Sequence, residues 1–174
     1  ADPASVDPGL ASGALSTVAQ HADQARFDAI LDRFRRGSTP QEQVRHLYAA
    51  AAVRDRQLFE QYLDLLSTDE VRSQNLAFAF RSALRNRDHG PLAWDRVERT
   101  WEKLLERLPS NSVNRCVEGI VTIHDPDVAA RVTAFLADHP VPQAAKHIDQ
   151  AIERMQVTVA LRRREADRIV AELP

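Results

Sequence analysis

The sequence has little of the chemistry that cross-links a chain or carries it into a membrane. Its single cysteine, Cys116, excludes an internal disulfide bond and a metal site built from several cysteines. No apolar run approaches the roughly 20 residues of a membrane-spanning helix, so we expect no membrane contact. Residues 1–9 contain no methionine and lack the apolar core of a signal peptide. We therefore expect a cytoplasmic chain that is one piece of a longer polypeptide.

An excess of charge of either sign is also missing. Lys and Arg together number 23 and Asp and Glu 25, which leaves a formal net charge of −2. Domains that bind nucleic acids are usually strongly basic. The basic run Arg162–Arg164 is followed by Glu165 and Asp167, so we interpret it as a solvated helix face. We therefore expect no nucleic-acid partner.

Glycine is scarce, at five residues, whereas alanine is abundant, at 26. Glycine weakens a helix interior and alanine favours it. Apolar residues recur at spacings of three and four along most of the chain, which predicts about eight amphipathic helices and no strand. Gly37 is placed to end one helix, and Thr39 and Asp125, each followed by proline, are placed to begin others.

The chain is predicted to have two parts. Residues 1–10, with two prolines and a glycine, are expected to be a flexible lead-in, and residues 11–174 a single helical-repeat domain. Short connections make neighbouring helices antiparallel, and one helix pair for roughly every 40 residues falls within the range of HEAT and armadillo repeats. We therefore predict an all-α fold of antiparallel hairpins stacked as a right-handed superhelix. A compact bundle is the alternative.

Two of the predicted helices are long. Apolar residues between positions 94 and 108 keep one helical spacing, and the last helix is predicted over about residues 142–173. The apolar stripe of this last helix comprises Ile148, Ile152, Met155, Val159, Ala166, Ile169, Val170 and Leu173. The bulkiest side chains of the helical stripes are expected to form the structural core: Phe80, Trp94, Trp101 and Phe135.

The residues alone predict no catalytic site. None of the six histidines lies four positions from another, which excludes the H-E-x-x-H zinc motif, and no G-x-S-x-G, P-loop or G-x-G-x-x-G pattern occurs. Asp125 and Asp127 form a carboxylate pair, but Asp125 is interpreted as a helix cap. Cys116 lies on an apolar stripe and is interpreted as an inert core thiol. No catalytic residue, metal ligand or cofactor is therefore expected in this chain.

A series of short motifs in the middle of the chain resembles a known family. It comprises Val71–Gln74, Arg85–Asn86, Pro91–Trp94 and Thr100–Leu104. The order is similar to that in the C-terminal helical domain of the aminopeptidase N family of zinc metallopeptidases, which includes the antigen-trimming aminopeptidases of the endoplasmic reticulum. Further similar segments are residues 22–23, 27–28, 40–42, 47–49, 132–136 and 148–153.

The resemblance implies that the parent polypeptide removes N-terminal residues from peptides, with a zinc ion in a separate catalytic domain upstream. In such enzymes the C-terminal helical domain caps the active site and forms one wall of an internal peptide chamber. The implied partners are the upstream domain and peptide substrates. Arg72 and Gln74, at the start of a predicted helix, and Asn86, at its end, are the candidates for lining this chamber.

A free-standing α-solenoid that binds a protein partner is the alternative function. An H-E-x-x-H motif upstream in the same reading frame distinguishes the two functions. If the chain is part of a longer solenoid, its first helices lack a neighbour. We then expect an apolar patch near residues 14–34, which permits a dimer through this end of the domain.

Overall fold

The computed structural model describes residues 7–109 and 111–172. Within these ranges the chain forms ten α-helices and two short 3-10 helices and contains no strand, which confirms the all-α prediction. The predicted lead-in lies partly outside the described residues, and helix α1 already begins at Pro8. The elements in chain order are α1 (Pro8–Gln20), α2 (Gln24–Arg36), α3 (Pro40–Ala50), α4 (Arg56–Leu66), α5 (Ser73–Leu84), α6 (Gly90–Arg99), α7 (Trp101–Arg107), α8 (Val113–Val117), η2 (Glu118–Thr122), α9 (Pro126–Asp138), η3 (Pro142–Ala144) and α10 (Ala145–Glu172).

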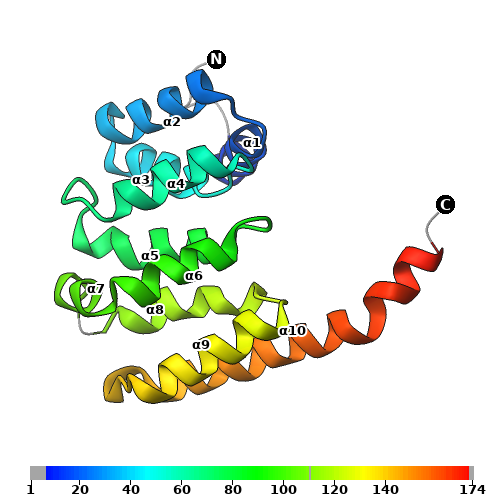
Figure 1. The fold of residues 1–174 in the computed structure, drawn as a ribbon. Helices are drawn as coiled ribbons and strands as arrows, with labels where there is room; N and C mark the ends of the chain where they lie inside the picture. Colours follow the sequence, from blue (N-terminus) through cyan, green and yellow to red (C-terminus); the bar gives the residue numbers. More distant parts are fainter. Residues whose placement is uncertain (1–6, 110, 173–174) are drawn as a thin grey trace.

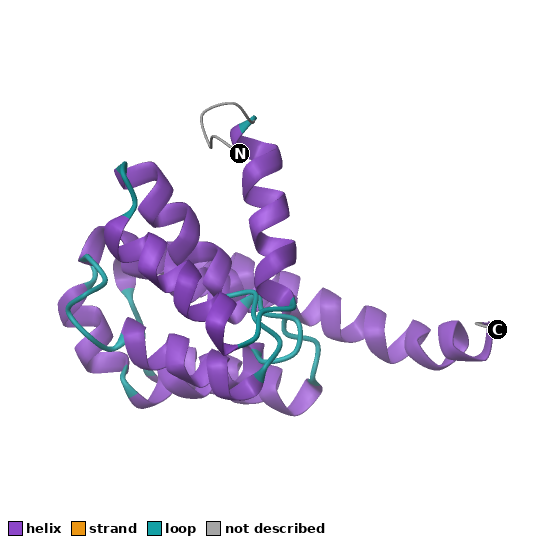
Figure 2. Cartoon of the chain, turned by 90° about the horizontal axis from the view of Figure 1, so that it is seen from above, coloured by secondary structure: helices purple, strands orange, loops and turns teal. Residues whose placement is uncertain are grey.

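The helices form hairpins that stack on one another (Figure 1). Helices α3, α5, α8 with η2, and α10 contact one another in that order and form one layer, which we call the α3–α5 layer. Helices α2, α4, α6 and α9 lie in the other layer, so each hairpin contributes one helix to each layer. Helix α1 lies across the first hairpin and contacts both α2 and α3 (Figure 2).

Local capping interactions determine where several helices begin. At the start of α3, Thr39 Oγ1 accepts a hydrogen bond from the backbone N–H of Glu42 at 3.1 Å. The Glu42 carboxylate accepts hydrogen bonds from the backbone N–H and the hydroxyl of Ser38, both at 2.8 Å. Asp125 Oδ1 accepts from two backbone N–H groups of the first turn of α9, both at 3.0 Å. The helix starts predicted at Thr39 and Asp125 are thus confirmed.

The apolar stripe between residues 94 and 108 forms two helices rather than the single predicted one. Helix α6 ends and α7 begins on either side of Thr100, whose backbone has φ −116° and ψ 16°. The Thr100 hydroxyl donates a hydrogen bond to the carbonyl oxygen of Arg96 at 2.8 Å. The Arg96 carbonyl also accepts the Thr100 backbone N–H at 3.1 Å, so the break lies in the non-helical backbone of Thr100, and the hydroxyl bond alone does not explain it.

The bulky side chains predicted for the core belong to one continuous hydrophobic cluster. Phe80, Trp94 and Trp101 are buried, and Phe135 is partly buried against them. The rings of Trp94 and Trp101 both contact Phe135 edge-on, with centroid distances of 5.7 and 5.6 Å. One phenylalanine of α9 therefore joins α6 and α7 to the last hairpin.

Close packing between η2 and α5 explains one of the few glycines. A Cβ atom at Gly119 would lie 2.6 Å from Leu84 Cβ and 2.9 Å from the carbonyl oxygen of Arg81. Only a residue without a side chain permits this approach. Since η2 also contacts α10, Gly119 lies where the middle of the α3–α5 layer meets its end.

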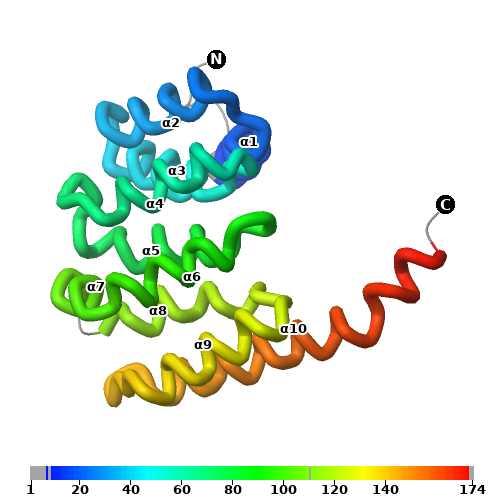
Figure 3. The backbone as a smooth tube through the Cα atoms, viewed as in Figure 1, coloured from blue at the N-terminus to red at the C-terminus, as the bar shows by residue number. Residues whose placement is uncertain are grey.

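The last helix continues beyond the body of the domain (Figures 1 and 3). Its buried residues are Ile148, Ala151 and Met155. After Val159 every described side chain is at least partly exposed, and Ile169 and Val170 are 54% and 72% exposed. The predicted stripe therefore covers a buried face only in the first half of α10, and its last member, Leu173, lies outside the described residues. In the described part of the chain no helix, α10 included, is long and apolar enough to cross a membrane.

Candidate functional site

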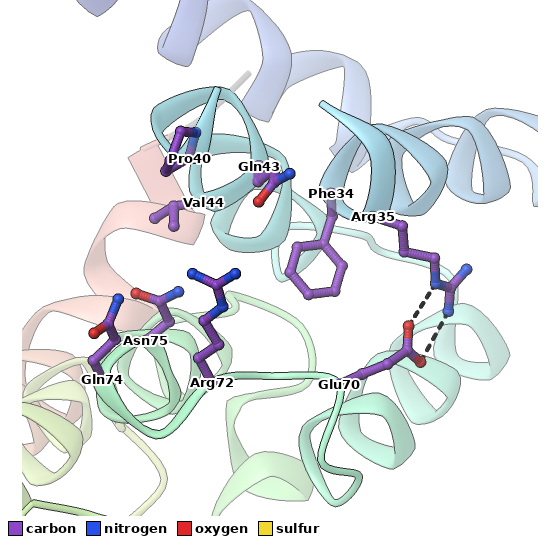
Figure 4. Close-up of a pocket in the computed structure, with 9 residues that line it drawn as sticks. All are labelled: Phe34, Arg35, Pro40, Gln43, Val44, Glu70, Arg72, Gln74 and Asn75. Carbon is purple, nitrogen blue, oxygen red and sulfur yellow. Dashed lines mark hydrogen bonds and ion pairs between the residues drawn. The ribbon is translucent and has the colours of Figure 1, made fainter. Parts of the chain in front are cut away.

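Arg72 and Gln74, two of the residues predicted to line a chamber, lie at the start of α5 and border the same pocket (Figure 4). The pocket has a volume of about 350 Å³ and lies between the N-terminal ends of α3 and α5 and the C-terminal end of α2. We call it the amide pocket after its three amide side chains. Its lining residues are Phe34, Arg35, Pro40, Gln43, Val44, Glu70, Arg72, Gln74 and Asn75.

One side of the amide pocket is closed by an ion pair. Arg35 Nε lies 2.6 Å from Glu70 Oε2, and its Nη2 lies 3.3 Å from Oε1. The hydrogen bond from Arg35 lowers the pKa of the Glu70 carboxyl, which stays ionised at neutral pH. The two charges compensate each other, so the pair contributes shape rather than net charge to the pocket.

Gln43 Nε2 donates to the carbonyl oxygen of Gly37 at 3.0 Å, whereas three other polar side chains of the pocket are available to a ligand. Arg72, Gln74 and Asn75 make no side-chain hydrogen bond or ion pair to any other described residue. Figure 4 shows the Arg72 guanidinium between the Phe34 ring and the amide of Asn75. The pocket thus combines apolar walls with amide donors and acceptors and one uncompensated guanidinium. This set of groups complements the N–H and C=O groups of a peptide backbone.

A half-buried aromatic surface follows the amide pocket along α5. The rings of Tyr48 on α3 and Phe78 on α5 are 6.3 Å apart between centroids. The guanidinium carbon of Arg81 lies 5.1 Å from the Phe78 ring centroid, and Arg81 Nη1 lies 2.9 Å from Glu118 Oε2. The hydrogen bond from Arg81 lowers the pKa of Glu118. Two aromatic rings and an ion pair therefore form a partly exposed surface of the α3–α5 layer. We call this surface its open face; it comprises Tyr48, Phe78, Arg81 and Glu118.

Asn86, the third predicted residue, lies at the opposite end of α5 and is only 8% exposed. Its Nδ2 donates to the carbonyl oxygens of Ala51 and Val53, both at 2.8 Å. Its Oδ1 accepts from the backbone N–H groups of Asp88 and His89, both at 2.9 Å. The side chain therefore joins the end of α3 to the turn that precedes α6.

Asn86 also borders a second pocket, of about 250 Å³, which we call the arginine pocket. The structure thus brings Arg72 and Gln74 together and places Asn86 in a different pocket, also between α3 and α5. That these three residues line a peptide chamber stays a prediction. The arginine pocket is lined by Gln20, Tyr48, Ala51, Ala52, Arg54, Ser82, Arg85, Asn86, Arg87 and Asp88.

Neither Cys116 nor Asp125 is available as a reactive side chain. Across residues 7–109 and 111–172, no group of three or more His, Cys, Asp or Glu side chains could hold a metal ion, so a zinc ion does not fit here. Cys116 is buried, and burial raises the pKa of its thiol to about 12. The thiol therefore stays protonated at neutral pH and is a poor nucleophile. Asp125 is occupied as the cap of α9.

Sequence reasoning missed the aromatic and basic residues between the two pockets. Phe78, Arg81, Ser82 and Arg85 recur at spacings of three and four and so share one face of α5. This mixed polar face, opposite the buried apolar stripe, could have been identified from the sequence. The contact between Tyr48 and Phe78 could not, because it depends on how α3 packs against α5.

Comparisons with known proteins agree with the all-helical architecture. The family of ERAP1-like C-terminal domains matches residues 1–157. Aminopeptidase M1-B from Oryza sativa subsp. japonica is 26% identical over 140 residues, which cover 79% of this chain and 16% of that protein. Glutamyl aminopeptidase from Homo sapiens is 27% identical over 140 residues, which cover 77% of this chain and 14% of that protein. The chain spans only about a sixth of the length of these curated relatives. It belongs to the family of ERAP1-like C-terminal domains.

Proposed function

We propose that the chain is the noncatalytic C-terminal domain of a zinc aminopeptidase that hydrolyses N-terminal residues from peptides. The match of residues 1–157 to the ERAP1-like C-terminal domains supports this, since the relatives named above are aminopeptidases. In this proposal the zinc ligands and the general base lie in an upstream catalytic domain of the same polypeptide. The helical domain caps the active site and forms one wall of the peptide chamber.

The open face of the α3–α5 layer is the proposed peptide-facing surface. The amide pocket begins at Gln74 and Asn75 on α5, and the arginine pocket extends to Arg85, the C-cap residue of the same helix. Ten helical positions correspond to about 15 Å, which is the length of about four residues of extended chain. The Tyr48 ring lines the arginine pocket and contacts the ring of Phe78, whose position on α5 lies between the two pockets. This arrangement suits an extended peptide whose backbone needs polar partners and whose side chains need apolar contacts.

A free-standing scaffold that binds another protein is the second candidate. Helix α1 carries no charged residue and exposes Leu10 and Val18 at 67% and 46%. In contrast, Phe27, Ile30 and Leu31 of the neighbouring helix α2 are buried, so α1 carries the exposed large apolar side chains of this end. The dimer through this end of the domain, expected if the chain is part of a longer solenoid, stays a proposal. An H-E-x-x-H motif upstream in the same reading frame favours the aminopeptidase, and a frame without it favours the scaffold.

The peptide-facing surface is tested in the full-length enzyme that carries this domain. Replacing Arg72 and Gln74 together by alanine removes two groups of the amide pocket. The ratio of kcat/KM for a long peptide to kcat/KM for an aminoacyl chromogenic substrate should then fall about fivefold or more. The reason is that only the long peptide reaches α5, and one lost hydrogen bond is worth about 1 kcal/mol.

The matched control is the double replacement of Arg26 and Gln57 by alanine. These exposed residues have the same chemistry but lie on α2 and α4, in the other layer. The control should leave the ratio unchanged. Equal falls in both double variants, or no fall in either, would contradict a peptide-facing role of the α3–α5 layer.

A further inference from the structure

The arginine pocket has a composition that the proposed chamber wall does not explain. Three arginines, Arg54, Arg85 and Arg87, border it together with a single carboxylate, Asp88. Asp88 is already paired, because Arg54 Nε lies 2.7 Å from its Oδ2. This hydrogen bond lowers the pKa of Asp88, which is ionised at neutral pH. Arg87 also helps to lower the pKa of Asp88, but only Arg54 is paired with this carboxylate, so Arg85 and Arg87 remain at the pocket without an ion-pair partner.

The protein itself does not use these two guanidiniums. Arg85 and Arg87 are exposed and make no side-chain hydrogen bond or ion pair to another described residue. The nearby backbone carbonyls are occupied by other groups, since Asn86 binds two of them and His89 Nε2 lies 2.8 Å from the carbonyl oxygen of Arg54. Glu118, whose pKa Arg85 also helps to lower, is held by Arg81 at 2.9 Å.

Neutral donors border the same pocket. Its lining includes Gln20 at the end of α1, which carries an amide, and Tyr48 and Ser82, which carry hydroxyl groups. The Tyr48 hydroxyl has no hydrogen-bond partner among the described residues, and burial raises its pKa, so it remains protonated and able to donate. The Ser82 hydroxyl donates to the carbonyl oxygen of Phe78 at 3.0 Å, so its proton is not available to a ligand. The pocket thus presents charged guanidinium groups beside neutral hydrogen-bond donors.

We infer that the arginine pocket is a binding site for an oxyanion, either a carboxylate or a phosphate group. A guanidinium presents two parallel N–H groups that match two oxygens of either anion. Two unpaired arginines from one turn supply the charge, and Tyr48 and Gln20 supply further hydrogen bonds. The volume of about 250 Å³ admits a small anion or the charged end of a larger molecule. The inference rests on this pocket alone and not on the proposed aminopeptidase function.

The test is a titration of the purified chain with inorganic phosphate and, separately, with acetate, at constant ionic strength maintained with chloride. Isothermal calorimetry and the thermal midpoint report binding. At least one anion should bind saturably, and Arg85→Gln with Arg87→Gln should raise its Kd about tenfold or more, because each lost charged hydrogen bond weakens binding. Preference for phosphate identifies a phosphate-bearing ligand, and binding of acetate identifies a carboxylate.

The matched control is Arg162→Gln with Arg163→Gln on α10, which removes the same charge far along the chain from the pocket. These exposed residues also lack a described partner, and their replacement should leave Kd unchanged. An equal rise of Kd in both double variants would show general charge attraction and overturn the site. The absence of saturable binding of either anion to the unaltered chain would overturn it as well. Both variants replace exposed side chains, and circular dichroism verifies that they fold.

Discussion

Single polar side chains hold the turns between helices together. The guanidinium of Arg107 donates to the carbonyl oxygens of Leu66, Thr68 and Val71 at 2.9, 2.7 and 3.0 Å. These carbonyls lie at and beyond the end of α4, where no helical N–H reaches them. The planar guanidinium of arginine has five N–H donors and can serve three acceptors at once. Asn86 has the corresponding role between α3 and α6.

Asn86→Ala should lower the free energy of unfolding by about 2–4 kcal/mol, measured by urea denaturation. The change removes four hydrogen bonds and leaves buried backbone groups without partners, each at a cost of about 1–3 kcal/mol before relaxation and water entry. Asn75→Ala is the control, since the Asn75 side chain has no described partner and its removal should cost less than about 0.5 kcal/mol. A loss below about 1 kcal/mol for Asn86→Ala would contradict the bridging role.

The buried thiol predicts a pH dependence of stability. Burial raises the pKa of Cys116 to about 12, above the value of about 8.5 in an unfolded chain. The contribution of the protonated thiol to the free energy of unfolding is therefore complete below pH 8.5. It is lost as the pH rises toward 12, because in that range the thiol ionises readily only in the unfolded chain. Between pH 7 and 10.5 the difference in unfolding free energy between the unaltered chain and Cys116→Ala should change by about 2–3 kcal/mol. A constant difference would show that the thiol ionises in the folded protein.

At the scale of helices, local features were predictable from the sequence and contacts between helices were not. The starts of α3 and α9 follow from Thr39 and Asp125, because a cap acts within its own first turn. The interruption at Thr100 was not predicted, since the apolar spacing continues through it and only the backbone conformation of Thr100 marks the break. The amide pocket was found in part, through Arg72 and Gln74. Its other walls come from α2 and α3 and depend on the stacking of hairpins.

Two glycines with opposite surroundings test the packing of the α3–α5 layer. Gly119→Ala should lower the free energy of unfolding by about 1–3 kcal/mol, because the new methyl group would overlap Leu84 on α5. At Gly13, in α1, an added Cβ meets nothing within 4 Å. Gly13→Ala should therefore raise stability by about 0.5–1 kcal/mol through higher helix propensity. Thermal and urea unfolding measure both, and a tolerated Gly119→Ala would contradict the close contact between η2 and α5.

The second half of α10 should be dispensable for folding. A chain that ends at Leu161 removes a segment whose described side chains are at least partly exposed. Its free energy of unfolding should lie within about 0.5 kcal/mol of that of the whole chain, as for surface changes in general. Limited proteolysis should also cut this segment before any other helix, because an isolated helix of this length is marginal in water. A large loss of stability in the shortened chain would show that this segment packs on the body.

The whole molecule is a stack of hairpins with one open layer that carries both pockets. The family match ends at residue 157, close to the last residues of α10 that pack on the body. The all-α stack was predictable because apolar spacing and caps repeat along the chain. The ligand surface was not, because the two pockets form only where α3 and α5 lie side by side. The fold therefore supplies two pockets on one layer, and the binding role and the source of the chemistry are both proposals.

The central claim is that this domain takes part in peptide hydrolysis without catalysing it. The most direct measurement is the hydrolysis of aminoacyl chromogenic substrates by the purified 174-residue chain, before and after incubation with zinc. The metal retained after dialysis is measured by elemental analysis in parallel. We predict no turnover above that of buffer and no stoichiometric zinc. Sustained turnover that a chelator abolishes would contradict the account.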